Sequence, residues 1–441
     1  MSHADSGLDK MQQSLATATQ RKPIVTFCSY DKPGNLGGPF SWLRWLLPLL
    51  RDRGLECRCL FLTHFGGTGP IVEGLRSDGF DCRVANCHSR MEDQVRWILE
   101  QLNEAPTDVF VPNLVVAAYH AARWVRACGI ATVGILHSDD PYYRAIQDEF
   151  VFGPPKLRLT NLVCVSRELE EQVLLRRPKE TTVLRIPYGV LVPNLSVRHS
   201  ASRFRMAYVG RMAEEQKRIS ETTRALIQAC QAIPNSEAVL FGDGPDLANV
   251  ERILATEGEG AAIRLAGPVS NAQVQSELLQ CDVIVLLSDY EGLPIALLEA
   301  MACGCVPVCL NMRSGIPELV QEGFSGMIVS DRDDSFLTAL KRLASDVSLR
   351  QQLGDRARAT VVERYSQNYA ADRWAEHLHQ LSRESSSQKI LMPRRILLSR
   401  RNPILESVEL RAIPPSWLKH LMRKARIWAG QVRRRLFPVE L

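Results

Sequence analysis

Short apolar runs rich in β-branched residues recur along this chain, and most are followed by a stretch with helical periodicity. In the first half they cover residues 23–30, 55–62, 108–113, 131–137, 161–166 and 182–187. In the second half they cover residues 204–211, 236–244, 261–267, 281–288 and 305–310. Strands that alternate with helices form parallel sheets covered by helices on both faces. The chain is therefore predicted to be an α/β protein with two doubly wound, Rossmann-like domains facing a central cleft.

The polar stretch 192–203 separates the two series and is interpreted as a linker. We expect the first domain over residues 21–195 and the second over 196–365. A helix over 366–384 should cross back to the first domain, and a tail follows over 385–441. Parallel sheets of this kind bind ligands at the carboxyl ends of their strands, so functional residues are sought in the loops that follow them.

Charge and cysteine usage restrict the setting in which the protein works. Residues 385–441 hold 13 Lys and Arg against 3 Glu, whereas the other 384 residues carry a net charge of −5. The 12 cysteines form no Cys-x-x-Cys pair, which favours a reduced, cytoplasmic setting. Residues 1–20 are polar and resemble no signal peptide, and no apolar run reaches the length of a spanning helix.

The basic tail contains one amphipathic pattern. Residues 416–437 repeat apolar side chains at steps of three and four, with most of the basic residues on the other faces. A basic amphipathic helix with tryptophans favours an anionic membrane surface. Packing on the body of the protein or on a second subunit is the alternative. No nucleic-acid partner is expected, because no aromatic-bearing nucleic-acid motif accompanies the basic residues.

The segment 288–308, SDYEGLPIALLEAMACGCVPV, combines a buried strand end, a tight turn and two carboxylates. Pro294 suits the first turn of a helix, so the amides of Gly292 and Leu293 are expected at a helix N-terminus, which suits a phosphate. Glu291 on the loop can accept hydrogen bonds from sugar hydroxyls, and Glu299 one turn later can hold a vicinal diol such as ribose. Alternatively, both glutamates are solvated or capping carboxylates.

Two cations follow the first strand of the second domain, in YVGRMAEEQKR at 208–218. Arg211 and Lys217 at the carboxyl end of a strand can neutralise a departing diphosphate, although ordinary surface charge is the alternative and fits Arg218. The glycine loop FGDGP at 241–245, which includes Gly242, either lets a nucleotide approach or only turns the chain.

The order of GRMAEEQKR, FGDGP, IRLAGPV and EGLPIALLEAMACGCVPV resembles the retaining glycosyltransferases of family 4, which have the GT-B fold. Glu291 and Glu299 match the E-x7-E motif of that family. The resemblance covers residues 23 to about 382 and is strong in the second half. It implies that Arg211 and Lys217 hold the diphosphate, that Glu291 holds the sugar, and that residues 265–269 line the base pocket. The donor-binding positions that it implies are Gly37, Gly38, Gly210, Gly242, Gly267, Val269, Gly292, Leu293, Pro294 and Glu299.

The first domain matches the family less closely. Gly37 and Gly38 lie in a glycine-rich loop after the first strand, but Pro39, Phe40 and Ser41 follow where the family often has an acidic residue. The alternative is that these glycines only open a helix. His137 ends a strand at a position where the family often has a histidine near the transferred sugar, although a core histidine is the alternative. Asp139 and Asp140 either serve the acceptor or cap a helix.

The resemblance implies a metal-independent, retaining transfer in which the nucleotide-diphosphate sugar is a co-substrate and no other cofactor takes part. The acceptor would be a glycan or a lipid-linked glycan of cell-surface polysaccharide or glycolipid synthesis, reached from the cytoplasmic side of the membrane. A non-catalytic GT-B protein that binds a nucleotide sugar or a partner as a regulator is the rival from another class. An epimerase or a phosphorylase on the same fold is a further alternative.

Overall fold

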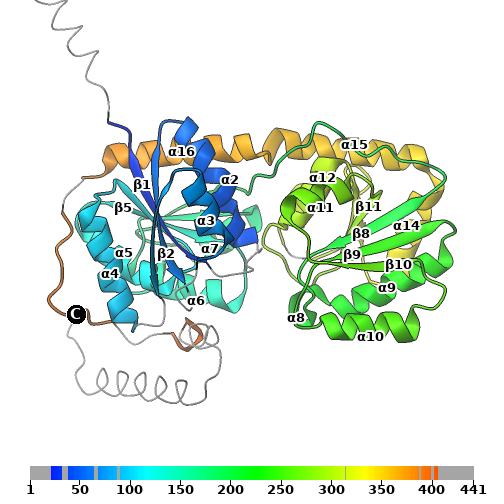
Figure 1. The fold of residues 1–441 in the computed structure, drawn as a ribbon, viewed down its shortest axis with the longest axis horizontal. Coiled ribbons are helices and arrows are strands. Elements are labelled where there is room, and N and C mark those ends of the chain that lie inside the picture. Colours follow the sequence, from blue (N-terminus) through cyan, green and yellow to red (C-terminus); the bar gives the residue numbers. More distant parts are fainter. Residues whose placement is uncertain are drawn as a thin grey trace, which may run out of the picture.

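The structure is a computed structural model that describes residues 21–31, 38–63, 68–86, 90–312, 314–386, 389–398 and 402–405. Two α/β domains lie side by side along the long axis of the molecule, and a pair of long helices runs along both (Figure 1). In the described part of the chain, one sheet has seven strands and the other has six.

The first domain is built on a parallel sheet with the strand order β3-β2-β1-β4-β5-β6-β7. The strands are β1 (Ile24–Asp31), β2 (Glu56–Thr63), β3 (Asp81–Asn86), β4 (Val109–Pro112), β5 (Ala131–Leu136), β6 (Asn161–Cys164) and β7 (Thr182–Arg185). The helices are α2 (Gly38–Asp52), α3 (Pro70–Ser77), α4 (Met91–Glu104), α5 (Val116–Ala127), α6 (Pro141–Phe150), the short η1 (Pro155–Leu157) and α7 (Arg167–Leu175).

The second domain repeats this plan, with the order β10-β9-β8-β11-β12-β13. Its strands are β8 (Phe204–Val209), β9 (Ser236–Phe241), β10 (Ile263–Gly267), β11 (Val283–Leu286), β12 (Val306–Leu310) and β13 (Met327–Val329). Its helices are α8 (Glu214–Lys217), α9 (Ile219–Ala232), α10 (Leu247–Glu257), α11 (Asn271–Leu278), α12 (Ile295–Cys303), α13 (Ile316–Leu319), α14 (Asp334–Ser345) and α15 (Val347–Arg364). In both domains the order reverses beside the first strand, and a parallel sheet places its ligand site at such a point.

The sequence pattern did not predict two of the four edge strands, β3 and β13. β3, DCRVAN, is half polar and only partly buried, and β13 has three residues. Edge strands pair on one side only and are often short or charged, so they carry a weaker apolar signal than central strands.

The last long helix, α16 (Gln367–Glu384), follows α15 and packs on α2 of the first domain. Two main-chain hydrogen bonds to Val190 fix the bend between α15 and α16. The Val190 amide donates to the Tyr365 carbonyl oxygen at 2.9 Å, and the Gln367 amide donates to the Val190 carbonyl oxygen at 3.0 Å. The Ser366 hydroxyl then caps α16 by accepting from the Tyr369 amide. The chain expected as a crossing helix over 366–384 thus joins the two domains.

The interior is apolar and contains many free cysteines. All eleven cysteines within the described residues are buried and free, for example Cys28 and Cys309 in central strands. Burial raises the pKa of these two thiols far above the ordinary range, so they behave as small apolar side chains. None of the helices in the described ranges is both long and apolar enough to cross a membrane.

Candidate active site

An ion pair joins the two loops that the sequence pattern singled out. Lys217 ends α8, after β8, and Glu291 lies in the loop after β11. The Lys217 ammonium nitrogen lies 2.5 Å from Oε1 of Glu291, and the two side chains are only 14% and 6% exposed. β8 and β11 are neighbours in the sheet, so their carboxyl ends bring these residues together across 74 positions of sequence.

Gln216 fixes the same two loops to each other through its main chain and its side chain. Its carbonyl oxygen accepts from the Asp289 amide at 2.9 Å. Its side-chain amide donates to the Tyr290 carbonyl oxygen at 3.0 Å and to Oε2 of Glu291 at 3.3 Å. The carboxylate of Glu291 is therefore held at both oxygens. Sequence reasoning missed Gln216, which is one of several polar residues in its segment.

A second charged cluster supports these loops from the side. Arg332 lies after β13, donates from Nε to the Leu287 carbonyl oxygen at 2.9 Å and pairs with Asp289 and Glu221. Arg218, with a left-handed φ of 47°, pairs with the same two carboxylates. The structure thus places Arg218 among partly exposed, ion-paired side chains, as the alternative of ordinary surface charge implies. Its ion pairs connect α9 to the loop that carries Glu291.

The glycine loop after β9 packs against the loop after β8. A Cβ on Gly242, whose φ is +136°, would lie 1.9 Å from the carbonyl oxygen of Gly210. A Cβ on Gly244 would lie 2.2 Å from the carbonyl oxygen of Met212, and the Met212 amide donates to the Asp243 carbonyl oxygen at 2.9 Å. These glycines therefore let the two loops make close main-chain contact, which positions the segment that follows Gly210. Contact of Gly210 and Gly242 with a nucleotide stays a prediction.

The side chains of Arg211 and Glu299 have no partner among the residues that the structure describes. The exposed Arg211 guanidinium makes no ion pair or hydrogen bond within the described residues. Glu299 lies on α12, and burial raises the pKa of its carboxyl to about 7. Its carboxylate likewise has no hydrogen-bond partner among the residues that the structure describes. Both groups are free to bind a ligand.

The turn before α12 differs in one respect from the prediction. The helix begins at Ile295, so Pro294 occupies the N-cap position instead of the first turn, and Gly292 and Leu293 precede the helix. Gly292 is buried against the first domain, since a Cβ there would lie 2.2 Å from the carbonyl oxygen of His137. This turn therefore lies where the two domains make contact.

The expected base pocket lies at the end of β10. Gly267 has a φ of +73° and open space where a side chain would be, and Val269 is partly buried. The Gly242 amide donates to the Gly267 carbonyl oxygen at 2.9 Å, which joins this strand end to the glycine loop. The positions are compatible with a base pocket, which stays a prediction.

His137 has protein partners for both of its ring nitrogens. Nε2 bonds to Oδ1 of Asn113 at 2.7 Å, and Nδ1 bonds to the Tyr188 hydroxyl. Burial lowers the pKa of His137 to about 3, so the ring is neutral at ordinary pH. A sugar hydroxyl would have to displace one of these bonds. The arrangement is that of a core histidine, the alternative that the sequence left open, and contact with the transferred sugar stays a prediction.

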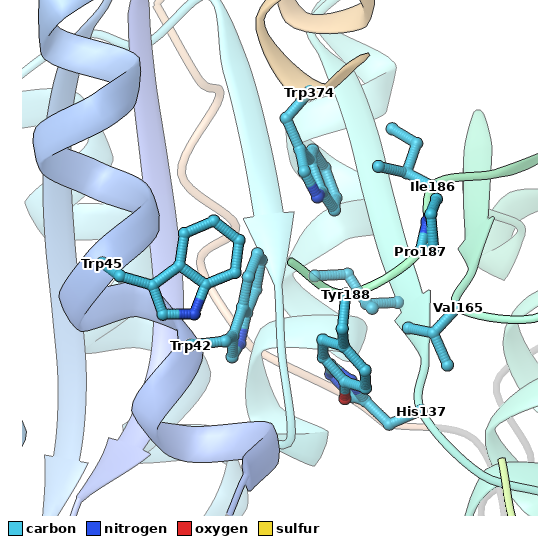
Figure 2. A pocket seen from close by; sticks show the side chains of 9 residues that line it. Trp42, Trp45, His137, Val165, Ile186, Pro187, Tyr188 and Trp374 are labelled. Atoms are coloured by element: carbon cyan, nitrogen blue, oxygen red, sulfur yellow. The ribbon is translucent and has the colours of Figure 1, made fainter. Parts of the chain in front are cut away.

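The His137 ring lines a small apolar pocket inside the first domain (Figure 2). Trp42 and Trp45 come to it from α2, Trp374 from α16 and Tyr188 from the loop after β7. The rings of Trp42 and Trp374 lie 5.5 Å apart between centroids. The pocket thus marks where α16 is anchored on the first domain.

The remaining first-domain candidates have other roles or lie outside the described residues. Asp140 caps α6 by accepting from the Tyr143 amide, and Asp139 pairs with Arg144 at 2.8 Å. Gly38 begins α2.

Two predictions fall on residues that the structure does not describe. Gly37 lies outside the described residues, as does the tail pattern over 416–437. Within the described ranges no three His, Cys, Asp or Glu side chains form a group that could hold a metal ion. The expectation of a metal-independent reaction stays a prediction.

Comparison with known proteins identifies the architecture. A structure of Alr3699/HepE from Anabaena in complex with UDP and glucose superposes with a TM-score of 0.65 at 17% identity, covering 80% of this chain and 99% of that one. A lipopolysaccharide outer core galactosyltransferase, WaaB, superposes with a TM-score of 0.64 at 17% identity, covering 81% and 99%. The chain has the GT-B fold. The two facing Rossmann-like domains and the helix that returns to the first are features of this GT-B chain.

Sequence comparison concerns mainly the second domain. Residues 197–360 match the family model described as glycosyl transferases group 1. The N-acetyl-alpha-D-glucosaminyl L-malate synthase of Bacillus anthracis is 27% identical over 224 residues, which are 50% of this chain and 54% of that protein. The amylovoran biosynthesis glycosyltransferase AmsK of Erwinia amylovora is 28% identical over 57% of this chain and 64% of its own length. The chain thus spans between about half and two thirds of the length of these two curated relatives. Every residue of the Lys217–Glu291 site lies within the segment that matches the family model.

Proposed function

We propose that this protein is a retaining glycosyltransferase that moves a sugar from a nucleotide-diphosphate donor to a glycan or lipid-linked acceptor in cell-surface polysaccharide or glycolipid synthesis. The observation that carries the proposal is the ion pair of Lys217 and Glu291 at neighbouring strand ends of the second domain. The Arg211 guanidinium, which has no partner within the described ranges, lies nearby in sequence. Likeness to the named relatives, which include a polysaccharide glycosyltransferase, supports it.

The electrostatic task of such a site is to stabilise the diphosphate charge that grows as the anomeric bond breaks. Arg211 is free to pair with phosphate oxygens at once. Lys217 is neutralised by Glu291 until a ligand arrives, and its ammonium group can then bond to phosphate while it keeps the carboxylate in place. Cations aimed at developing charge in a partly buried site contribute most to the rate, because little solvent reorganises during the step.

The two glutamates would then have separate roles in donor binding. Glu291, held at both oxygens by Lys217 and Gln216, presents a fixed acceptor to sugar hydroxyls. Glu299 has no hydrogen-bond partner in the described part of the chain, and two adjacent hydroxyls of a ribose can supply the hydrogen bonds that its partly buried carboxylate lacks there.

The bond changes of the proposed reaction balance without a protein nucleophile. The bond from the anomeric carbon to the diphosphate oxygen breaks, and the acceptor oxygen attacks the same face of the sugar. The acceptor proton passes to the departing phosphate oxygen, so the configuration is retained. The chain itself supplies positioning and charge stabilisation, and contact between the domains beside Gly292 would exclude water.

Thermal unfolding with UDP-, GDP-, ADP- and TDP-linked sugars tests donor binding first. A ligand at 100 times its Kd stabilises the native state by about 2.7 kcal/mol, so one nucleotide class should raise the midpoint. Lys217→Ala should lose this rise, whereas Lys341→Ala, an exposed lysine on α14, should keep it. Product analysis by NMR with the identified donor should then show the anomeric configuration retained.

Two outcomes would contradict the proposal. If no donor raises the midpoint of the folded protein, the non-catalytic reading is favoured. If a donor binds and the product has the inverted configuration, the retaining mechanism fails.

A further inference from the structure

After α16, residues 389–398 run along the outer side of the first domain, away from the second domain, and residues 402–405 lie near α6 (Figure 1). We name residues 389–398 and 402–405 the strap. The Asn103 side chain on α4 forms two hydrogen bonds with the Ile390 main chain, at 2.8 and 2.9 Å. The strap also buries four apolar side chains in the core formed with α4 and α5, namely Ile390, Ile396, Leu398 and Leu405. The strap is therefore a fixed part of the surface of this domain.

Other apolar side chains of the strap point into solvent. Leu391 is 81% exposed, and Met392, Leu397 and Ile404 are 37%, 40% and 39% exposed. These four are among ten exposed large apolar residues in the whole described chain, although the strap is only a small part of it. Three of them lie next to a buried apolar residue in the sequence, and Met392 follows Leu391. The buried neighbours anchor the main chain, while these four side chains stay exposed. A concentration of exposed apolar groups on a fixed surface indicates an interaction site.

The polar side chains of the strap are basic. Lys389, Arg394 and Arg395 make no ion pair within the described residues, and the strap contains no Asp or Glu. Arg96 on α4 donates to the Arg394 carbonyl oxygen at 3.4 Å and adds a further cation without a carboxylate partner in the described chain. The surface therefore combines apolar side chains with unneutralised positive charge.

We infer that the strap is a docking surface for an anionic lipid bilayer. Apolar side chains that can enter the interface, flanked by cations that can meet lipid phosphates, are the two features that such a surface requires. The position of the following chain favours lipid over other occupants. Leu405 is anchored in the same core, and residues 406–441 continue from there with 8 Lys and Arg against 3 Glu. The inference does not depend on the proposed transfer reaction.

Co-sedimentation of the full chain with vesicles tests the strap. The protein should bind vesicles of phosphatidylglycerol and phosphatidylcholine and should bind pure phosphatidylcholine much more weakly. Leu391→Ser/Leu397→Ser should weaken binding to the anionic vesicles at least about tenfold, since immersion of one leucine is worth about that factor. Arg394→Gln/Arg395→Gln should weaken it at least about fivefold, with the loss fading at high salt.

Matched controls lie on other parts of the surface. Leu175 and Leu195 are 75% and 70% exposed, so Leu175→Ser/Leu195→Ser removes at least as much exposed apolar area outside the strap. Lys179→Gln/Lys341→Gln removes two exposed cations that have no ion pair within the described residues. Both control variants should bind within about twofold of the unaltered chain, and all variants should keep their unfolding midpoint.

Three results would overturn the inference. The first is that the unaltered chain fails to bind anionic vesicles. The second is that the strap variants bind them as tightly as the unaltered chain. The third is that the control variants lose as much binding as the strap variants. Sedimentation velocity covers the remaining occupant. If the strap variants change the state of self-association and leave vesicle binding unchanged, the strap is an interface between copies of this chain and the lipid assignment is wrong.

Discussion

The Lys217–Glu291 pair allows the structural and catalytic contributions of one interaction to be separated. The perturbations are Lys217→Met, Glu291→Gln and the double variant. The ion pair is 2.5 Å long and its side chains are 14% and 6% exposed, so either single substitution leaves one charge partly buried without its partner. Removing one partner of a buried pair costs about 3–5 kcal/mol, and the bond from Gln216 to Glu291 places Lys217→Met at the lower end, about 3 kcal/mol.

The double variant should behave differently from either single variant. Methionine and glutamine are neutral and similar in volume to the residues that they replace, so no unpaired charge remains. Replacing a buried pair by neutral groups is often nearly neutral, and we expect its free energy of unfolding within about 1 kcal/mol of the unaltered chain. Transfer should still be lost, because the diphosphate has lost a cation and the sugar a carboxylate. One such electrostatic group is worth about 10²–10³ in rate.

Urea unfolding followed by circular dichroism gives the stabilities, and release of nucleotide diphosphate in the presence of acceptor gives the rates. A Lys217→Met variant as stable as the unaltered chain would refute the argument from the buried pair. A double variant that is stable and still transfers sugar would refute the site. Arg224→Gln/Glu257→Gln removes an exposed pair with 2.8 Å separation and should change neither quantity appreciably.

Three further predictions concern groups around this site. Burial raises the pKa of Glu299 to about 7 in the folded chain, against 4.5 in the unfolded chain. The free energy of unfolding should therefore fall by about 3 kcal/mol as pH rises from 4.5 through 7. Glu299→Gln should remove that pH dependence when unfolding is measured at pH 5 and pH 8. An unchanged slope would contradict the assignment. Gly292→Ala would place a Cβ 2.2 Å from the His137 carbonyl oxygen, so the substitution should force the domains apart. It should lower the rate of transfer and enlarge the radius of gyration measured by X-ray scattering. An unchanged radius with full activity would count against that contact. Tyr188→Phe removes the hydroxyl bonded to Nδ1 of His137. It should lower the free energy of unfolding by about 1–3 kcal/mol and leave the donor-induced midpoint shift unchanged. An unchanged stability with a lost midpoint shift would instead place His137 in the reaction.

The sequence predicted the two sheets and the segments that hold the candidate site. Apolar periodicity is a local property, so eleven of the thirteen strands in the described chain could be located from it, including the edge strands β7 and β10. The spacing of Glu291 and Glu299 on one loop and helix is local in the same way. The edge strands β3 and β13 were missed, because β3 is half polar and β13 has only three residues.

The tertiary structure decided which residues meet and which remain free. The pairing of Lys217 with Glu291 spans 74 positions and follows from the adjacency of β8 and β11, which no local pattern records. The close packing of Gly242 on Gly210 and the saturation of the His137 ring by Asn113 and Tyr188 are likewise long-range contacts.

The same distinction explains the strap. In the sequence, Ile390 and Leu391 are equivalent apolar neighbours after a long helix. Only the packing of the strap on α4 buries the first and exposes the second. Residue type and spacing therefore determined the fold class and the chemistry available to the chain, and the contacts between distant segments decided which of those groups are occupied by the protein and which can reach a ligand.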